Sequence, residues 1–592
     1  MLPSLRAPPT DAAPERPMPP PLPRLPLGTS DFREIRRQRW YYVDKTALVA
    51  DVLDNSNKVL LLPRPRRFGK TLNLSTLRYF LELPQPDEGE AVAARAARAA
   101  LFEGLHIASR ADLCDAHLAA HPVLFLTFKD VKAANWADCR AGIAATIAAE
   151  ASRISATLEP HLGADDRERL QALRARTADN ADLSKAFLHL SQCLHRATGR
   201  QVAILIDEYD TPLHSAFEHG YHDEAIDLIR NLLSGGLKDN TALYKGVLTG
   251  ILRVAKESVF SGLNNPGVFT LLHTPFSTAF GFTQAEVEAL LHAADRYADL
   301  PELERWYNGY RFGGQVIYNP WSVLSYLNNP VDGFAPYWVN TASDALLRQL
   351  LVQRASAELP DLEALLRGET VEKLVDEAVS LRTVYADPGA VWAFLLHCGY
   401  LRADSATPER RYWRATLRVP NREVASALQG LFETALAAGV GGSSGVEHLC
   451  QALLGGDART VQHTLGELLA LTLSYHDLGR GRKPEVVYQA FVAGLLVAMD
   501  RTHEVRSNRE SGFGRVDVLV RPRKAGANGV VMELKVVDTE MDETAEQAML
   551  AAKAQLIERD YAAEVRAAGA AVVRQYAVVF DGKRCRVEVV GA

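Results

Sequence analysis

Residues 59–71 read Val59-Leu-Leu-Leu-Pro-Arg-Pro-Arg-Arg-Phe-Gly-Lys-Thr71, a short apolar run followed by a basic loop. Residues 71–83 then carry apolar side chains at helical spacing. A strand, a loop ending in Gly-Lys-Thr and a helix form the arrangement in which backbone N–H groups surround phosphates. The stretch therefore predicts a nucleotide-binding loop at a strand of a parallel α/β sheet.

One position of this loop departs from the usual phosphate-binding pattern. The first glycine of G-x-x-x-x-G-K-[ST] would fall at residue 64, which is arginine. We expect the Lys70 amine to bind the β and γ phosphates of ATP and the Thr71 hydroxyl to hold Mg²⁺. The other loop residues expected to contact the nucleotide are Arg64, Arg66, Arg67, Phe68 and Gly69. The alternative interpretation is a basic turn before a helix.

Further apolar runs at 122–128, 202–206 and 243–249 have the length and β-branched content of buried parallel strands. The second run is followed by two carboxylates, Asp207 and Glu208. In ATPases with a phosphate-binding loop, carboxylates at this point hold Mg²⁺ and orient the attacking water. We expect Asp207 to be the Mg²⁺ ligand and Glu208 the general base. The alternative is the polar strand end of any α/β fold.

Two residues at and after the end of the third run complete the nucleotide hypothesis. The Thr249 hydroxyl is a candidate sensor of the γ-phosphate, and Arg253 is a candidate for stabilising the charge that develops during its transfer. Arg253 is equally consistent with a surface or structural arginine.

The C-terminal region carries a second set of acidic and basic residues. Glu533 and Lys535 are two apart in an apolar strand pattern, so both side chains point to one face, and Asp517 lies in the preceding strand. Carboxylates that hold Mg²⁺ or Mn²⁺ beside a cation promote phosphodiester hydrolysis. We expect Asp517, Glu533 and Lys535 to form a catalytic, metal-binding centre, with Glu485 as a further carboxylate. The alternative is structural pairing of these charges.

Other residues of this region are candidates for supporting roles. Gln555 and Tyr561 follow in a helical pattern and could line the centre. A chain of net charge −6 needs a local basic patch to hold a phosphate backbone. Arg506, Arg509 and Arg515 would supply that charge.

The length and composition indicate several ordinary globular domains. The chain has 592 residues, of which 47% are hydrophobic and 23% charged. No run of about 18 uninterrupted apolar residues is present, so the sequence predicts no membrane span. The six cysteines lack the spacing of metal-binding motifs and indicate reduced thiols in a cytoplasmic protein.

We predict an α/β multidomain fold in four regions. Residues 1–26, rich in Pro, Ala and Arg, form a disordered leader, with a later start at Met18 as the alternative. Residues 27–275 form an ATPase domain on a parallel sheet, and 276–460 form a helical lid and linker. Residues 461–592 return to a mixed α/β pattern with a restriction-endonuclease-like order of elements.

Some segments of the last two regions are predicted individually. Residues 346–352 and 371–379 have helical spacing, and 412–419 form a small β element. Residues 543–564 form one long helix, between strands at 530–537 and 576–580.

A set of longer motifs points to one family. Besides the loop at 64–71 and Glu533-Leu-Lys535, the chain contains Tyr42-Val-Asp-Lys-Thr46, Leu205-Ile-Asp-Glu-Tyr-Asp210, Phe260-Ser-Gly-Leu-Asn-Asn265, Trp306-Tyr-Asn-Gly-Tyr310, Tyr318-Asn-Pro-Trp-Ser322 and Ser507-Asn-Arg-Glu-Ser-Gly-Phe-Gly-Arg-Val-Asp517. From about Pro26 to its end, the chain resembles the bacterial AAA-ATPase-like proteins that carry a C-terminal PD-(D/E)XK nuclease domain. The resemblance implies ATP binding by the first half and a restriction-endonuclease-like fold in the last part. Arg64 at the first loop position is typical of these proteins, whereas Gln489 stands where similar sequences tend to have histidine.

The leading hypothesis is an ATP-binding protein that couples its nucleotide state to Mg²⁺-dependent cleavage of nucleic acid, with DNA favoured and a homo-oligomer possible. One alternative is a signalling NTPase whose nuclease-like domain only binds nucleic acid or protein partners. A third is a nuclease fold that acts in protein interaction. The joint presence of Asp517, Glu533 and Lys535 favours catalysis, because a pure binding module needs no such set.

Overall fold

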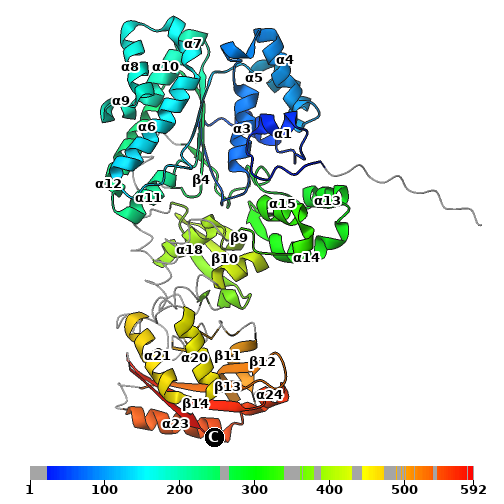
Figure 1. Cartoon of the computed structure of the whole chain (residues 1–592), viewed down its shortest axis with the longest axis vertical. Helices are drawn as coiled ribbons and strands as arrows, with labels where there is room; N and C mark the ends of the chain where they lie inside the picture. Colours follow the sequence, from blue (N-terminus) through cyan, green and yellow to red (C-terminus); the bar gives the residue numbers. More distant parts are fainter. Residues whose placement is uncertain are drawn as a thin grey trace, which may run out of the picture.

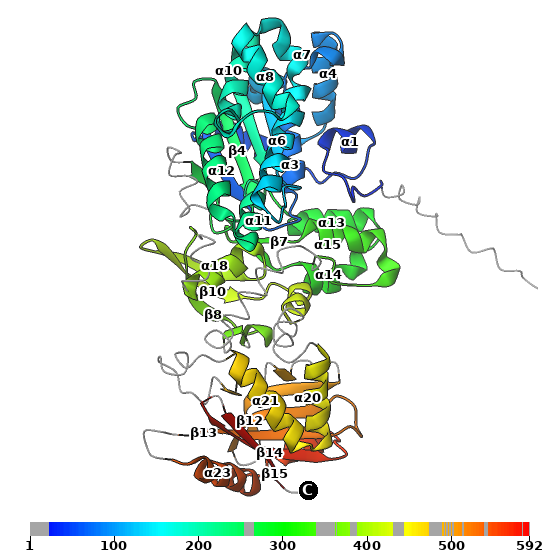
Figure 2. The same cartoon turned by 60° about the vertical axis from the view of Figure 1, so that its left-hand side comes forward.

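The computed structural model describes residues 23–253, 266–338, 361–378 without 363, 388–429, 443–472 and 488–590, the last with short gaps at 490–491, 493–494, 497–498, 500–501, 512–513, 538–542 and 583. Three parts follow one another along the longest axis of the molecule (Figure 1, Figure 2). A parallel sheet with flanking helices occupies one end, a smaller mixed part lies in the middle, and a second large sheet occupies the other end.

The sheet of the first part has the strand order β2-β3-β4-β1-β5, and its neighbouring strands are all parallel. Its strands are β1 (Val59–Pro63), β2 (Val123–Thr127), β3 (Val202–Asp207), β4 (Leu243–Gly250) and β5 (Gly267–Val268). All side chains of β1 and β3 are buried, as expected for central strands covered on both faces. The predicted parallel sheet is confirmed.

Helices cover both faces of this sheet (Figure 1). On one side lie α1 (Phe32–Arg37), α3 (Lys70–Leu81), α4 (Ala91–Phe102) and α5 (Ala111–His117), with α2 (Ala47–Asp54) packed on α3. On the other side lie α6 (Trp136–Arg153), α7 (Ser155–Leu158), α8 (Ala164–Ala175), α9 (Asn180–Ser184), α10 (Ala186–Thr198), α11 (Thr211–His219) and α12 (His222–Leu237).

The parallel arrangement places the carboxyl ends of the strands at one edge of the sheet. The register pairs Thr127 with Asp207 and Leu62 with Thr249. The basic loop of 64–69 leaves β1 at this same edge and leads into α3. The topology therefore brings the loop and the acidic strand end of β3 together.

The middle part combines helices with two small sheets. Helices α13 (Gln284–Ala293) and α14 (Leu300–Tyr307) precede the hairpin of β6 (Tyr310–Phe312) and β7 (Gln315–Ile317), which α15 (Pro320–Asn328) follows. A three-stranded antiparallel sheet has the order β8-β10-β9, with β8 (Val371–Val375), β9 (Arg402–Glu409) and β10 (Tyr412–Arg418), and α18 (Pro388–Cys398) packs against β8. The predicted β element at 412–419 is confirmed by β10.

One helix prediction in the middle part is wrong. Residues 371–375 form strand β8, which pairs with β10 from Val371 to Val375. The buried side chains, Val371 and Val375, are four residues apart, and this spacing fits one face of a helix and one face of a strand equally well. The helix predicted at 346–352 lies outside the described residues.

The sheet at the far end has the order β11-β12-β13-β14-β15, in which only the pair of β13 and β14 is parallel. Its strands are β11 (His503–Ser511), β12 (Gly514–Pro522), β13 (Gly529–Val536), β14 (Val573–Asp581) and β15 (Arg584–Val590). Helices α20 (Ser443–Gly455) and α21 (Ala458–Thr472) cover one face, and α23 (Ala545–Glu558) and α24 (Ala562–Ala567) cover the other.

Two other boundaries differ from the sequence prediction. The single helix predicted at 543–564 is broken between α23 and α24, where Asp560 has a left-handed φ of 39°. Leu25, assigned to the leader, is buried, and the carbonyl of Arg24 accepts a hydrogen bond from the backbone N–H of Tyr41. The packed chain therefore begins before residue 26.

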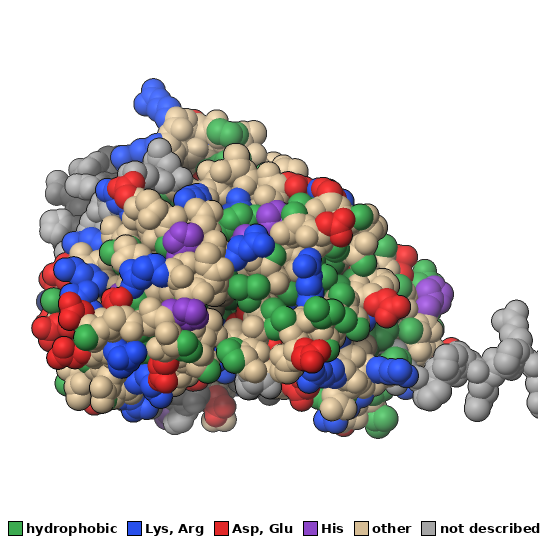
Figure 3. Space-filling model, turned by 90° about the horizontal axis from the view of Figure 1, so that it is seen from above, with side chains coloured by type: hydrophobic (Ala, Val, Ile, Leu, Met, Phe, Trp, Pro, Cys, Tyr) green, Lys and Arg blue, Asp and Glu red, His purple; other side chains and the backbone are tan. Residues whose placement is uncertain are grey.

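The surface of the first part at the end away from the middle part mixes charges of both signs. In Figure 3, which views this end from above, Lys and Arg side chains alternate with Asp, Glu and apolar ones. This end presents no broad basic surface in its described residues. Within the described part of the chain, none of the helices has the length and apolar character needed to cross a bilayer.

Candidate functional site

The carboxylate of Asp207 is the centre of the first candidate site. It lies at the end of β3, has no exposed surface, and accepts hydrogen bonds from the hydroxyls of Thr71 at 2.7 Å and Thr249 at 2.7 Å. Thr127 of β2 adds a third hydroxyl at 3.3 Å. Burial, and then the neighbouring Glu208 carboxylate, raise the pKa of Asp207. Three strand ends and the first turn of α3 thus converge on one carboxylate.

The Lys70 amine lies beside this group, inside the curve of the loop. It donates to the carbonyls of Arg64 and Pro65, each at 3.1 Å, and lies 3.3 Å from the Glu208 carboxylate. Lys70 is buried, with 4% of its surface exposed. Glu208 has a left-handed φ of 53°, a strained geometry for a non-glycine residue that turns the chain sharply after β3. The structure therefore brings Lys70, Thr71, Asp207 and Glu208 together, as the sequence predicted.

The loop conformation depends on a glycine just before the helix. Gly69 has a φ of 85° and precedes the first residue of α3. An L side chain is strained at this φ, so glycine is favoured there. Phe68, the preceding residue, points into the core and packs edge-on against Tyr310, with ring centroids 4.9 Å apart.

Arg64 occupies a different place from the one expected of a nucleotide-contacting residue. Its side chain is completely buried, and its guanidinium donates to the carbonyls of Pro63, Phe269 and Phe276 at 2.7–3.1 Å. Burial lowers the pKa of Arg64 to about 9. The side chain thus anchors the loop to residues 269–276 and lies in the core, away from the nucleotide cavity described below.

The next two arginines connect the loop with the middle part. The Arg67 guanidinium donates to the carbonyl of Tyr337 at 3.1 Å and lies 4.2 Å from the centre of the Trp321 ring. The Trp338 indole N–H donates to the carbonyl of Arg66 at 3.3 Å. Two residues of the loop therefore contact the segment that follows α15.

A buried carboxylate, Glu423, fixes this contact from the other side. It accepts hydrogen bonds from the backbone N–H of Trp338 at 2.7 Å and from the Ser322 hydroxyl at 2.8 Å. Burial raises the pKa of Glu423 to about 7. We call Arg67, Trp321, Tyr337, Trp338 and Glu423 the loop joint, because they connect the phosphate-binding loop to the middle part.

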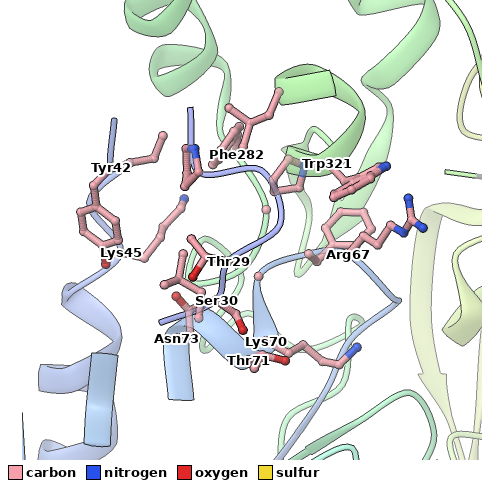
Figure 4. Close-up of a pocket in the computed structure, with 18 of the residues that line it drawn as sticks. Thr29, Ser30, Tyr42, Lys45, Arg67, Lys70, Thr71, Asn73, Phe282 and Trp321 are labelled. Atoms are coloured by element: carbon pink, nitrogen blue, oxygen red, sulfur yellow. The ribbon is translucent and has the colours of Figure 1, made fainter. Parts of the chain in front are cut away.

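A cavity of about 330 Å³ opens beside Lys70 and Thr71 (Figure 4). Residues from three segments, 26–45, 67–73 and 279–324, line it together with Glu208. Its apolar and aromatic side chains are those of Pro26, Leu27, Tyr41, Tyr42, Val43, Phe68, Leu72, Ala279, Phe282, Pro320, Trp321 and Leu324. In Figure 4, Arg67 lies alongside Trp321, and Tyr42 and Lys45 lie across the cavity. The cavity thus joins an apolar wall to the phosphate-binding loop, a combination suited to a nucleotide.

The residues of the Asp44-Lys45-Thr46 motif make structural contacts at this cavity. The Lys45 amine pairs with the Glu286 carboxylate at 2.6 Å, and burial lowers its pKa. The Asp44 carboxylate accepts from the Thr46 hydroxyl at 2.6 Å and from the His106 backbone N–H at 2.6 Å. Lys45 also lines the cavity, so its ion pair with Glu286 does not prevent its side chain from contacting a ligand there.

The remaining residue predicted for this site lies apart. Arg253 is half-buried in the loop after β4, and no described contact joins it to Lys70, Asp207 or Glu208. The third acid of the strand-end motif, Asp210, is structural, because it accepts from the N–H groups of Ile251 and Leu252 at 2.8 and 3.0 Å.

The donor set at Asp207 fits a hard divalent cation. Mg²⁺ prefers carboxylate and hydroxyl oxygens together with phosphate oxygens. Thr71 and Asp207 supply the first two within 2.7 Å of each other, and Thr71 lines the cavity. These two residues could therefore hold Mg²⁺ with a bound nucleotide.

The second candidate site lies where two strands of the far sheet separate. β12 pairs with β13 only from Val518 to Val520, whereas its pairing with β11 continues to Gly514. At the point of separation, the Asp517 carboxylate accepts a hydrogen bond from the backbone N–H of Leu534 at 2.8 Å. The side chain of Asp517 thus reaches the strand that carries the other two predicted residues.

Glu533 and Lys535 project from β13 on the face covered by α23 and α24. Leu534, between them, belongs to the core on the opposite face. The Lys535 amine lies 3.5 Å from the Glu533 carboxylate, which is buried to 2% exposure. Asp517, Glu533 and Lys535 therefore meet at one place, as their order in the sequence predicted.

Tyr561, the N-cap residue of α24, lies near this site. Burial raises the pKa of Tyr561, and the Glu533 and Asp517 carboxylates add to the rise. The Arg559 guanidinium lies 3.4 Å from the Tyr561 hydroxyl and is also attracted by Glu533. The sequence indicated Tyr561 as a lining residue but gave no sign of Arg559, since a single arginine after a helix has no distinctive pattern.

The other candidates near this site have different positions. The Gln489 amide donates to the backbone carbonyl of Asp517 at 2.7 Å, so it positions that strand. Gln555 lies on α23, and no described contact joins its side chain to either carboxylate. Glu485 lies outside the described residues.

The predicted basic patch is only partly described. Arg506 is engaged in ion pairs with Glu504 and, at 3.4 Å, with Glu564. The side chains of Arg509 and Arg515 lie outside the described part, although their backbones belong to β11 and β12.

The chain is similar to two protein families and to one further protein. Residues 26–260 match the family described as "Predicted AAA-ATPase", and residues 483–589 match the PD-(D/E)XK nuclease superfamily. A protein of Azotobacter chroococcum mcd 1, named "Uncharacterized protein in vnfD 5'region", is 31% identical over 415 residues, which cover 68% of this chain and 69% of the relative. The two matched ranges contain the Asp207 site and the Glu533 site respectively.

Proposed function

The chain belongs to the AAA-ATPase-like proteins with a C-terminal PD-(D/E)XK nuclease superfamily domain, and from this premise we propose that it binds and hydrolyses ATP and cleaves nucleic acid, with DNA as the favoured substrate. The proposed ATP hydrolysis rests on the convergence of the Thr71 and Thr249 hydroxyls on Asp207, beside the cavity of about 330 Å³. The proposed cleavage of nucleic acid rests on the meeting of Asp517, Glu533 and Lys535 at the point where β12 and β13 separate.

The apolar wall of the cavity suits the base of ATP, and the loop suits its phosphates. The Lys70 amine, which now binds loop carbonyls, would exchange these for β and γ phosphate oxygens. When bound, Mg²⁺ at Thr71 and Asp207 supplies charge neutralisation for the phosphates. Thr249, bonded to Asp207, would report the state of the metal site to β4.

Glu208 is the proposed general base for hydrolysis. A water oxygen attacks the γ-phosphorus, the bond from that phosphorus to the β–γ bridging oxygen breaks, and Glu208 accepts the water proton. The products are ADP and inorganic phosphate. One Glu208 oxygen lies 3.3 Å from Lys70 and the other 3.3 Å from the Thr211 hydroxyl, so the carboxylate is held in place from two sides.

Glu208→Gln is expected to retain ATP binding and to slow hydrolysis by ~100-fold or more, because glutamine keeps a hydrogen-bonding oxygen but cannot accept the proton. Calorimetric titration with ATP and the rate of phosphate release measure the two quantities. Glu224→Gln, an exposed carboxylate in the first turn of α12, is the matched control and should hydrolyse ATP at the wild-type rate. Unchanged hydrolysis in Glu208→Gln would show that another group is the base.

At the second site, Asp517 and Glu533 are the proposed metal ligands and Lys535 the cation beside the scissile phosphate. When bound, the metal supplies an activated water and neutralises charge on the phosphate. The side chains provide the geometry: two carboxylates at one point of the sheet, the Lys535 amine 3.5 Å from Glu533, and Tyr561 near enough for both carboxylates to raise its pKa.

We also propose that the loop joint couples the nucleotide state to the rest of the chain. Arg67 lines the nucleotide cavity and at the same time holds Tyr337 and Trp321. A ligand that moves Arg67 must therefore change contacts in the middle part. Cleavage of supercoiled plasmid with Mg²⁺ in the ATP, ADP and nucleotide-free states tests this coupling directly.

ATP is expected to change the amide hydrogen-exchange rates of residues 320–338 and 388–429 by about fivefold or more. This factor corresponds to the lower end of typical coupling free energies, about 1 kcal/mol. Exchange is measured by mass spectrometry on Glu208→Gln protein with and without ATP. The effect should weaken in Arg67→Ala. Peptides of α8, which lies far from the cavity, serve as the internal control. Identical exchange in both states would favour two independent modules.

A further inference from the structure

A second cavity, of about 270 Å³, lies on the other side of the phosphate-binding loop. It is lined by Arg66 of the loop, by Phe394 of α18, by Lys132, Ala133 and Ala134 of the segment between β2 and α6, and by Thr211, His214, Ser215, Glu218 and His219 of α11. We call it the α11 cavity. It shares no lining residue with the nucleotide cavity, so it is a separate space.

Positive charge dominates the lining of the α11 cavity. Arg66 and Lys132 are the two cationic side chains of the lining, against one lining carboxylate, Glu218, while His214 faces the buried Asp210 carboxylate at 3.4 Å. In the described part of the chain, neither the Arg66 guanidinium nor the Lys132 amine makes a hydrogen bond or an ion pair. Most other basic groups around the loop are engaged, as Arg64, Arg67 and Lys70 show. Two unengaged cations that line one cavity indicate an anionic ligand.

Glu208 lies between the two cavities. It lines the nucleotide cavity and pairs there with Lys70, while its second oxygen accepts from the Thr211 hydroxyl, which lines the α11 cavity. Thr211 is also the first residue of α11, where the helix dipole favours negative charge. An anion released at Glu208 therefore has a cationic space immediately behind the carboxylate.

We propose that the α11 cavity binds inorganic phosphate, the anion that ATP hydrolysis produces, before it leaves the protein. This inference rests on the proposed ATPase function. Arg66 and Lys132 are the binding cations, and the Thr211 hydroxyl marks the side from which phosphate enters. ADP then remains in the nucleotide cavity while phosphate leaves through a different opening.

The test is direct binding of inorganic phosphate to protein saturated with Mg²⁺ and ADP, measured by calorimetry. Lys132→Ala is expected to weaken phosphate binding about tenfold or more, the loss of one charge-assisted contact, with ADP affinity unchanged. Lys132→Arg should restore most of the affinity. Lys129→Ala removes the same charge three residues earlier, at an exposed position outside the lining, and should have no effect.

Product inhibition gives a second measure of the same site. In Lys132→Ala, inhibition of ATP hydrolysis by phosphate should weaken about tenfold while the KM for ATP stays the same. Equal phosphate affinity in wild type and Lys132→Ala, an equal loss in Lys129→Ala, or no phosphate binding at millimolar concentration would each overturn the proposal.

The proposed ATPase function can fail independently of this site. If the wild-type protein binds neither ATP nor ADP, the titration is repeated with nucleotide-free protein. Phosphate binding that is lost in Lys132→Ala but kept in Lys129→Ala then supports the cavity, and its absence refutes it.

Discussion

Glu533→Ala is expected to lower metal-dependent cleavage of plasmid DNA by about three orders of magnitude, the rate equivalent of ~4 kcal/mol, while ATP binding persists. The carboxylate lies at the strand separation with Asp517 and Lys535, so its loss removes a metal ligand from the centre of the site. Nicking of supercoiled plasmid with Mg²⁺ or Mn²⁺ measures the effect, and EDTA should abolish wild-type cleavage. Asp517→Ala and Lys535→Ala should behave in the same way.

The controls for this experiment separate catalysis from folding. Glu533 is buried, so Glu533→Gln keeps the volume of the side chain and should be as inactive as the alanine variant with an unchanged thermal transition. Glu546→Gln, at an exposed position on α23 in the same part of the chain, should cleave at the wild-type rate. Cleavage that persists in Glu533→Gln, in protein free of contaminating nucleases, would remove this site from the mechanism and favour a binding role.

Lys70→Ala is expected to weaken ATP binding about 30-fold, because charge-assisted hydrogen bonds to phosphate contribute ~1.5–3 kcal/mol each and ~1.4 kcal/mol is tenfold in affinity. The amine lies inside the loop and lines the nucleotide cavity beside Thr71. Calorimetric titration with ATP and Mg²⁺ measures the change, and hydrolysis should fall with it.

Lys70 also makes contacts within the protein, so its removal needs a structural control. Its amine pairs with Glu208 and caps two loop carbonyls. Lys70→Arg keeps the charge, and an unchanged thermal transition in both variants would show that the loop remains folded. Lys58→Ala, one residue before β1, removes a lysine of the same part outside the cavity lining and should bind ATP normally. Equal ATP affinity in wild type and Lys70→Ala would refute the assignment of the loop.

The local elements of the nucleotide site are readable from the sequence. Residues 59–81 contain a buried strand, a loop that needs glycine at position 69, and a helix, and each depends on neighbouring residues alone. The meeting of Thr71, Asp207 and Thr249 was also predictable, because the carboxyl ends of parallel strands share one edge. The same holds for Glu533 and Lys535, which alternate on one strand.

Other predictions failed where the local sequence is compatible with two different structures. Arg64 has the charge of a phosphate ligand, yet its guanidinium is buried against backbone carbonyls, because the segment at 269–276 offers acceptors that the sequence does not reveal. Val371 and Val375 fit a helix or a strand, and pairing with β10 decided between them.

The sequence by itself determined the strand-loop-helix at 59–81, the parallel sheet around it and the acidic and basic residues of both sites, because these follow from spacing along the chain. Only the tertiary structure decided how residues 26–45 and 279–324 close over the loop to form the nucleotide cavity, and how Glu208 comes to separate it from the α11 cavity. The loop and residues 279–324 are more than 100 residues apart in the sequence, and their meeting depends on the packing of whole helices, which no local periodicity encodes.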